Sequence, residues 1–178
     1  MIARALFLDR DGTLIRDVGY PRDPASVELV PGVVEALSTA RELGYKLAIV
    51  SNQSGVARGL IQPAEARAVQ ARVDELFAAR AVSFDGAWFC FHGPDEGCRC
   101  RKPAPGLILD AASALEVDRA RSIMVGDKPS DVDAGIAAGC AAVLFGEAHH
   151  PRAEARFSSW AEFAGWLRAN ADVGAWKG

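Results

Sequence analysis

The chain has 178 residues, of which 50% are hydrophobic and 24% are charged, with a formal net charge of -3 and a pI near 5.6. These values are typical of one globular domain with a full core, and they exclude the basic field that nucleic-acid binding needs. Because no basic segment precedes a long apolar run and no stretch could span a bilayer, we expect a soluble, cytoplasmic protein with no membrane partner. We also expect a monomer that forms one domain over residues 1–178.

The first predicted strand is the apolar run of residues 5–8, which is bounded by charge and glycine. Asp9 and Asp11 follow it, and their side chains would point the same way if the strand continued through both. Two carboxylates this close repel unless a cation or proton lies between them, so the pair suits Mg²⁺ and a phosphate ester. Asp9 could attack phosphorus, and Asp11 could protonate the leaving oxygen and later activate water. A solvated turn is the alternative for these two residues alone.

The next segments form a loop, a helix and a second strand. Residues 17–24 are rich in Pro and Gly, which predicts a loop near the site. Residues 33–43 have apolar positions at helical spacing, and residues 46–50 predict the second strand. Ser51 follows, and its hydroxyl could donate to a phosphate oxygen together with the amides of the loop at 52–55. A polar turn is again the alternative.

A second helix is predicted from Pro63 to Phe77, and residues 86–91 predict a third strand. That strand leads into a C-x-H-x5-C-x-C pattern within residues 90–100, formed by Cys90, His92, Cys98 and Cys100. Four such ligands in one short loop can close a tetrahedron around Zn²⁺ with no open position, which predicts a structural metal. A redox pair or unrelated buried thiols are the alternatives, and a cytosol would reduce a disulfide.

Arg101 and Lys102 follow this cluster immediately. The planar guanidinium of Arg101 can donate two parallel hydrogen bonds to a phosphate, and the ammonium of Lys102 can pair with it as a point charge. Surface solvation is the alternative for such a pair. Residues 107–115 predict a third helix and residues 122–125 a fourth strand.

The fourth strand ends near Asp127, which could supply the further carboxylate that a Mg²⁺ ion at Asp9 would need. Asp131 is expected to begin the next helix, with Ser130 as its N-cap.

The C-terminal part contains a fifth strand at residues 141–145 and a last helix that begins with a capping box at residues 159–162. The tail from Asp172 is expected to fray. The pattern as a whole predicts an α/β fold, a doubly wound Rossmann-like parallel sheet with helices on both faces.

Chemical groups thus fall at successive strand ends in the order Asp9 with Asp11, Ser51, Lys102, and Asp127 with Asp131. This order resembles the four motifs of the haloacid dehalogenase (HAD) superfamily of phosphohydrolases. The segments 8–14, 19–20, 52–59, 100–106 and 126–128 are similar to its histidinol-phosphate phosphatase subfamily, in which a zinc loop replaces the cap. The resemblance runs from Ala5 to about Leu144.

The resemblance implies a capless phosphoric monoester hydrolase with Asp9 as nucleophile and Asp11 as acid and base. Ser51 and Lys102 would hold the phosphoryl group, and Mg²⁺ would bind Asp9, the Asp11 carbonyl and Asp127. Zn²⁺ would bind the four residues of the cluster. The substrate-binding residues implied are Asp17, Tyr20, Asn52, Gln53, Ser54, Arg101 and Lys128.

Two substrates fit this resemblance. One is a heptose 1,7-bisphosphate that loses its C7 phosphate during lipopolysaccharide core and nucleotide-heptose synthesis, and the other is histidinol phosphate of histidine synthesis. Arg101 favours the bisphosphate, whereas the short span from Gly93 to Gly97 resembles the histidinol-phosphate enzymes. A non-catalytic, zinc-bearing phosphate-binding module is the alternative from another class.

Overall fold

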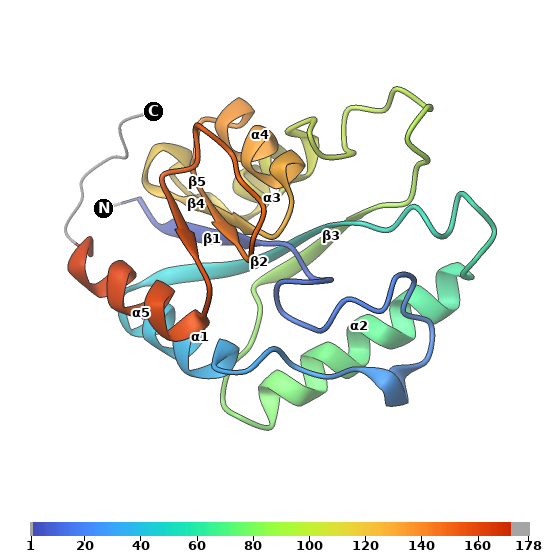
Figure 1. The fold of residues 1–178 in the computed structure, drawn as a ribbon, viewed down its shortest axis with the longest axis horizontal. Coiled ribbons are helices and arrows are strands. Elements are labelled where there is room, and N and C mark those ends of the chain that lie inside the picture. The colour runs from blue at the N-terminus through green and yellow to red at the C-terminus, as the bar shows by residue number, and fades with distance from the viewer. Residues whose placement is uncertain (1, 172–178) are drawn as a thin grey trace.

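The computed structural model describes residues 2–171 and contains one open sheet of six parallel strands in the order β3-β2-β1-β4-β5-β6 (Figure 1). The strands are β1 (Arg4–Leu8), β2 (Tyr45–Asn52), β3 (Gly86–Cys90), β4 (Ile123–Gly126), β5 (Ala141–Phe145) and β6 (Ala155–Phe157). In the central register Leu8 pairs with Ile49 of β2 and with Val125 of β4. The carboxyl ends of β1, β2 and β4 therefore meet at one edge of the sheet, where such folds bind ligands.

Helices cover both faces of the sheet (Figure 1). Leu6 and Leu8 of β1 belong to the core on the face of α1 (Val33–Glu42), α2 (Pro63–Ala78) and α5 (Trp160–Ala169). Ala5 and Phe7 belong to the core on the opposite face, under α3 (Gly106–Leu115) and α4 (Pro129–Ala137). Burial on both faces explains why the central strands read as continuous apolar runs rather than alternating ones. The predicted doubly wound parallel sheet is confirmed.

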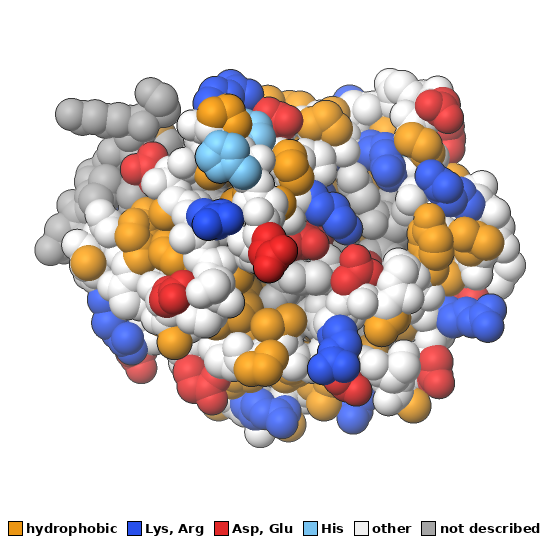
Figure 2. Space-filling view, in the orientation of Figure 1, with side chains coloured by type: hydrophobic (Ala, Val, Ile, Leu, Met, Phe, Trp, Pro, Cys, Tyr) orange, Lys and Arg blue, Asp and Glu red, His pale blue; other side chains and the backbone are white. Residues whose placement is uncertain are grey.

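Within residues 2–171 the connections after β1, β2 and β3 consist of loops, single helices and a 3₁₀ turn at Pro24–Ser26, without an inserted cap domain. A second 3₁₀ turn at Arg119–Arg121 precedes β4. No helix in this part of the chain is both long and apolar enough to cross a membrane. Charges of both signs are interspersed over the face drawn in Figure 2.

Three details differ from the sequence expectations. The short strand β6 was not predicted, because three residues with a central arginine carry too little periodicity. Helix α4 begins at Pro129 with Lys128 as N-cap, whereas the sequence analysis expected Asp131 to begin it with Ser130 as N-cap; proline suits the first helical position. At α5 the Ser159 hydroxyl accepts from the Glu162 N–H as predicted, but the Glu162 carboxylate accepts from the Ser158 N–H. The tail from residue 172 lies outside the described residues.

Candidate active site

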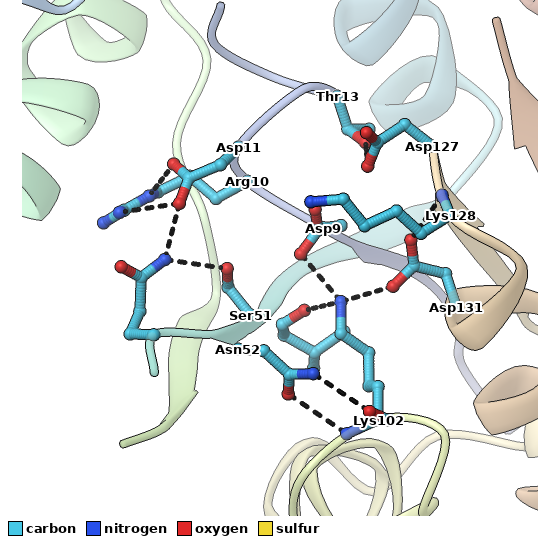
Figure 3. Close-up of polar contacts among 12 residues, drawn as sticks. Asp9, Arg10, Asp11, Thr13, Ser51, Asn52, Lys102, Asp127, Lys128 and Asp131 are labelled. Atoms are coloured by element: carbon cyan, nitrogen blue, oxygen red, sulfur yellow. Dashed lines mark hydrogen bonds and ion pairs between the residues drawn. The ribbon is translucent and has the colours of Figure 1, made fainter. Parts of the chain in front are cut away.

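Lys102 is the centre of the polar cluster at the carboxyl edge of the sheet (Figure 3). Its Nζ lies 2.7 Å from Asp9 Oδ1 and 2.6 Å from Asp131 Oδ1, and it donates to the Val50 carbonyl at 2.8 Å. Lys102 as a whole residue is only 3% exposed. Burial alone would lower the pKa of Lys102, but the carboxylates of Asp131 and Asp9 outweigh it and raise that pKa. Lys102 is therefore a buried ammonium that points directly at Asp9.

The backbone of Lys102 is fixed by Asn52, the last residue of β2. The Asn52 amide nitrogen donates to the Lys102 carbonyl at 3.0 Å, and the Lys102 N–H donates to Asn52 Oδ1 at 3.0 Å. Asn52 also lines the cavity, as predicted for a substrate-binding residue. Its amide is already engaged by the backbone, so positioning Lys102 is the role that its contacts support.

Three carboxylates gather beside this ammonium. Oxygen atoms of Asp9, Asp127 and Asp131 lie within 4.8 Å of one another. The pKa of Asp127 is raised to about 7, mainly by burial and further by the negative charges of Asp9 and Asp131, although Lys128 opposes this change. Burial likewise raises the pKa of Asp131, while Lys102 opposes that change. A divalent cation with a preference for oxygen ligands would relieve this repulsion, so the donor set fits Mg²⁺.

Two glycines allow these carboxylates to come so close. A Cβ atom at Gly12, whose φ is +88°, would lie 2.4 Å from Asp127 Oδ2. A Cβ atom at Gly126 would lie 2.2 Å from Asp131 Oδ2. Any larger residue at either position would displace a carboxylate.

Asp131 was grouped with Asp127 at the end of the fourth strand, but the sequence analysis assigned it only the start of the next helix and no role in the site. It is the third residue of α4, 2% exposed, and its Oδ2 accepts from the Lys128 N–H at 3.0 Å. With Oδ1 on Lys102, both of its oxygens are engaged. An acidic residue in the first turn of a helix usually indicates only where the helix starts. The sequence therefore contains no indication that Asp131 also pairs with Lys102.

Asp11 turns away from Asp9, toward Arg10 (Figure 3). Strand β1 ends at Leu8, so the strand alternation considered for the two aspartates does not apply. Arg10 Nε lies 2.9 Å from Asp11 Oδ1, and its Nη2 lies 3.2 Å from Oδ2. Gln53 Nε2 donates to Asp11 Oδ2 at 2.7 Å and to Ser51 Oγ at 3.1 Å. Arg10 was not predicted, and a charged residue between two aspartates gave no signal of burial.

A cavity of about 650 Å³ opens over this cluster. Its lining includes the predicted residues Asp9, Asp11, Asp17, Tyr20, Ser51, Asn52, Gln53, Ser54, Arg101, Lys102 and Lys128, together with Asp131. Asp127 is half-buried beside Asp9 and Asp131. The lining thus contains charged side chains of both signs, together with apolar surface from the surrounding loops.

The rim of the cavity is built by loops that contact one another. Lys128 Nζ lies 3.7 Å from Asp17 Oδ2, and Arg101 Nη1 donates to the His92 carbonyl at 3.3 Å. Tyr20 packs so closely on Gly55 that a Cβ atom there would lie 2.6 Å from Tyr20 Cδ1. Two cations from separate loops therefore face a cavity whose floor holds Asp9 and Lys102.

The four cysteine and histidine residues of the sequence pattern converge beside this rim. Cys90 Sγ lies 3.7 Å from Cys98 Sγ and 3.2 Å from Cys100 Sγ, and Cys98 and Cys100 are 3.5 Å apart. His92 Nδ1 lies 3.5 Å from Cys90 Sγ and 3.2 Å from Cys100 Sγ. A Zn–S bond of about 2.3 Å implies a tetrahedron edge of about 3.8 Å, so the ligand atoms stand close to their places in a zinc site. No disulfide links these thiols.

The thiols differ in how readily they lose a proton. Burial first, and hydrogen bonding with Cys100, raise the pKa of Cys90 to about 12. Desolvation opposes ionisation of Cys98, but hydrogen bonds from the Arg101 N–H and the neighbouring thiols together outweigh it and lower its pKa to about 7. Cys98 is therefore the most readily ionised of the three thiols.

The sheet, the strand-end carboxylates and the buried lysine define a hydrolase of a known family. Residues 17–139 match the sequence model of the family described as haloacid dehalogenase-like hydrolase, and the chain belongs to that family.

Within it, the chain is similar to proteins named D-glycero-beta-D-manno-heptose-1,7-bisphosphate 7-phosphatase. That of Yersinia pestis is 42% identical over 141 residues, which cover 75% of each chain. That of Helicobacter pylori is 43% identical over 134 residues, covering 75% of this chain and 78% of the relative. That of Escherichia coli K12 is 40% identical over 141 residues, covering 75% and 74%.

Solved structures agree with these relatives. The D,D-heptose 1,7-bisphosphate phosphatase from B. bronchiseptica, complexed with magnesium and phosphate, is 30% identical and superposes with a TM-score of 0.84, covering 93% of this chain and 99% of that one. The D,D-heptose 1,7-bisphosphate phosphatase from Burkholderia thailandensis is 27% identical with a TM-score of 0.68, covering 93% and 99%.

Proposed function

We propose that this protein is a Mg²⁺-dependent phosphatase that removes the C7 phosphate of D-glycero-D-manno-heptose 1,7-bisphosphate through an aspartyl-phosphate. The observation that carries the chemistry is the Asp9 carboxylate, which is paired with a buried ammonium at the floor of the cavity. The relatives at 40% to 43% identity support the substrate. The cations Arg101 and Lys128 on the rim suit a second phosphate at the far end of the sugar.

In this mechanism Asp9 attacks phosphorus in line with the leaving oxygen. Lys102 holds its Oδ1, and the other carboxylate oxygen forms the bond to phosphorus as the ester bond breaks. The electron pair of the broken ester bond goes to the C7 oxygen, and this oxygen receives a proton from Asp11. Lys102, the Ser51 hydroxyl and the amides of the following loop bind the phosphoryl oxygens as their charge develops.

The second step regenerates the enzyme. A water molecule attacks phosphorus and gives its proton to Asp11, the Asp9–phosphorus bond breaks, and inorganic phosphate leaves. Mg²⁺, held by Asp9, Asp127 and the Asp11 carbonyl, would neutralise phosphoryl charge in both steps. Both oxygens of Asp131 are already engaged, so it serves to hold Lys102 rather than the metal.

We further propose that Cys90, His92, Cys98 and Cys100 bind a structural Zn²⁺. The support is the near-tetrahedral spacing of their ligand atoms and the lowered pKa of Cys98. Free thiols in this arrangement suit a reducing compartment, so we place the protein in the cytoplasm. We propose a monomer of one catalytic domain over residues 1–178, with a place in lipopolysaccharide core and nucleotide-heptose synthesis.

The test is Mg²⁺-dependent release of phosphate from both anomers of the heptose 1,7-bisphosphate and from histidinol phosphate, measured side by side. The expected result is a large preference in kcat/KM for a heptose bisphosphate, and no release by Asp9→Asn. As a control, Asp110→Asn removes an exposed partner of Arg99 and should leave the rates unchanged. A preference for histidinol phosphate would keep the chemistry and refute the substrate, and no release from any ester would favour a binding module.

A further inference from the structure

Arg10 is an unusual residue in the interior of this protein. Its side chain is fully buried, and among the fully buried side chains of residues 2–171 only Trp160 is larger. Arginine is rarely buried unless it is paired. The one ion pair that it makes in the described chain is with its neighbour Asp11.

The surroundings of Arg10 indicate a role other than stability. Its Nη1 is buried without a hydrogen-bond partner, which costs free energy. Its Cζ lies 5.7 Å from the centroid of the Phe89 ring, on the strand that leads to the zinc loop. A packed apolar side chain would serve such a position at least as well. What an apolar residue could not do is bind both oxygens of Asp11.

Gln53 completes the arrangement from the other side. A carboxylate only accepts hydrogen bonds, so the amide nitrogen of Gln53 must face Asp11. The same nitrogen donates to Ser51 Oγ, which leaves the Ser51 hydrogen free to donate toward a phosphoryl oxygen. The Gln53 N–H donates to the Cys90 carbonyl at 2.7 Å, which fixes the residue to the end of β3.

We infer that Arg10 and Gln53 are positioning residues that hold the Asp11 carboxylate as a hydrogen-bond acceptor, ready to take a proton from water. The inference rests on the proposed function, in which Asp11 is the base for hydrolysis of the aspartyl-phosphate. Three N–H groups converge on the two oxygens, and none of them requires the substrate. Loss of Arg10 should therefore slow the second step more than the first.

The test uses p-nitrophenyl phosphate, because its leaving group departs without a proton and the first step then needs no acid. In Arg10→Met we expect kcat to fall about 10- to 100-fold and KM to fall with it, so that kcat/KM, which reports the first step, changes less than about threefold. A burst of p-nitrophenolate that approaches one per enzyme should precede the slow steady rate, and rapid acid quench should show the phosphorylated protein by mass. Arg10→Lys keeps the positive charge but loses the paired N–H groups that bind both oxygens of Asp11, so its kinetics should resemble those of Arg10→Met.

Arg4→Met is the matched control. Arg4 is the first residue of β1, at the end away from the site, and donates to the carbonyls of Leu43 and Ala171 at 2.8 Å each. Its loss should lower Tm without a burst and without a fall in kcat per folded molecule.

The inference is overturned if folded Arg10→Met retains wild-type kcat, or if its kcat falls without accumulation of phosphorylated protein. Should Arg10→Met fail to fold, Gln53→Met removes one of the three donors at similar side-chain volume. This variant should give a smaller burst, and the absence of any burst would count equally against the inference. If wild-type protein releases no phosphate from this ester or from heptose bisphosphate, the proposed function itself fails.

Discussion

Replacing Asp131 by alanine should destabilise the protein strongly, because it breaks a buried ion pair from one side. The side chains of Asp131 and Lys102 are each 2% exposed, and their charged atoms are 2.6 Å apart. Removing one partner of such a pair typically costs about 3–5 kcal/mol, and losing a capping contact at a helix start costs about 1 kcal/mol.

Two features of the site reduce this cost. Lys102 keeps Asp9 and the Val50 carbonyl as partners, and the repulsion of Asp131 with Asp9 and Asp127 disappears. We therefore expect a loss of about 3 kcal/mol in the free energy of unfolding. For a domain of this size that corresponds to a fall in Tm of about 6–12 °C.

The assay is urea unfolding of metal-free protein, with Asp133→Ala as the matched control. Asp133 lies two residues further along α4, with a side chain 40% exposed, where it pairs with Arg152 at 2.9 Å and with His150 at 3.2 Å. A surface pair of this kind should contribute less than about 1 kcal/mol. If the two alanine variants unfold at the same urea concentration, the argument from the buried pair is wrong.

Four further outcomes follow from the site. Asp9→Asn should abolish both phosphate release and the phosphorylated intermediate, and turnover near the wild-type rate would disprove its role as nucleophile. Asn52→Leu removes the two hydrogen bonds that hold the Lys102 backbone, so kcat should fall at least about tenfold while the protein remains folded, as circular dichroism would check. The pKa of Asp127 is raised from 3.8 to about 7, so the folded metal-free protein binds more protons than the unfolded chain between these values, and its stability should fall as pH rises through this window. Mg²⁺ should therefore raise Tm more at about pH 8 than at about pH 5, and Asp127→Asn should remove that difference. Removal of zinc by a chelator should reduce activity without abolishing it, and full activity of zinc-free protein would separate the cluster from the site.

The sequence was sufficient to predict the sheet and most of the candidate site because both depend on local signals. Short apolar runs that end in polar or glycine-rich turns mark the central strands, and parallel strands bring their carboxyl ends to one edge. That rule brings Asp9, Ser51 and Asp127 together, whereas Lys102, which follows the cysteine and histidine loop after β3, was joined to them by the resemblance to the four motifs. The cysteine and histidine spacing likewise identified four residues that the fold brings together.

The roles that were missed, those of Asp131 and Arg10, depend on side-chain direction, which the pattern does not contain. Asp131 shows the ordinary signature of a helix start, and only the position of Lys102, 29 residues earlier in the chain, makes it part of the site. Arg10 looks solvated in the sequence, but the chain leaves the strand after Leu8 and turns its guanidinium inward. Both depend on tertiary packing that propensity and periodicity cannot represent.

The partial effect expected of zinc removal follows from how the Lys102 segment is held. Cys100 belongs to the cysteine and histidine cluster, through which a bound metal would hold the beginning of the segment, and the Gly106 N–H ties its end to the Arg99 carbonyl at 3.0 Å. Between these points Asn52 binds the Lys102 backbone twice, and the ammonium is paired with two buried carboxylates. Loss of the metal would release only the first restraint. The metal loop thus limits the motion of this segment, while β2 and α4 set where the lysine points, so the catalytic geometry should outlast the metal.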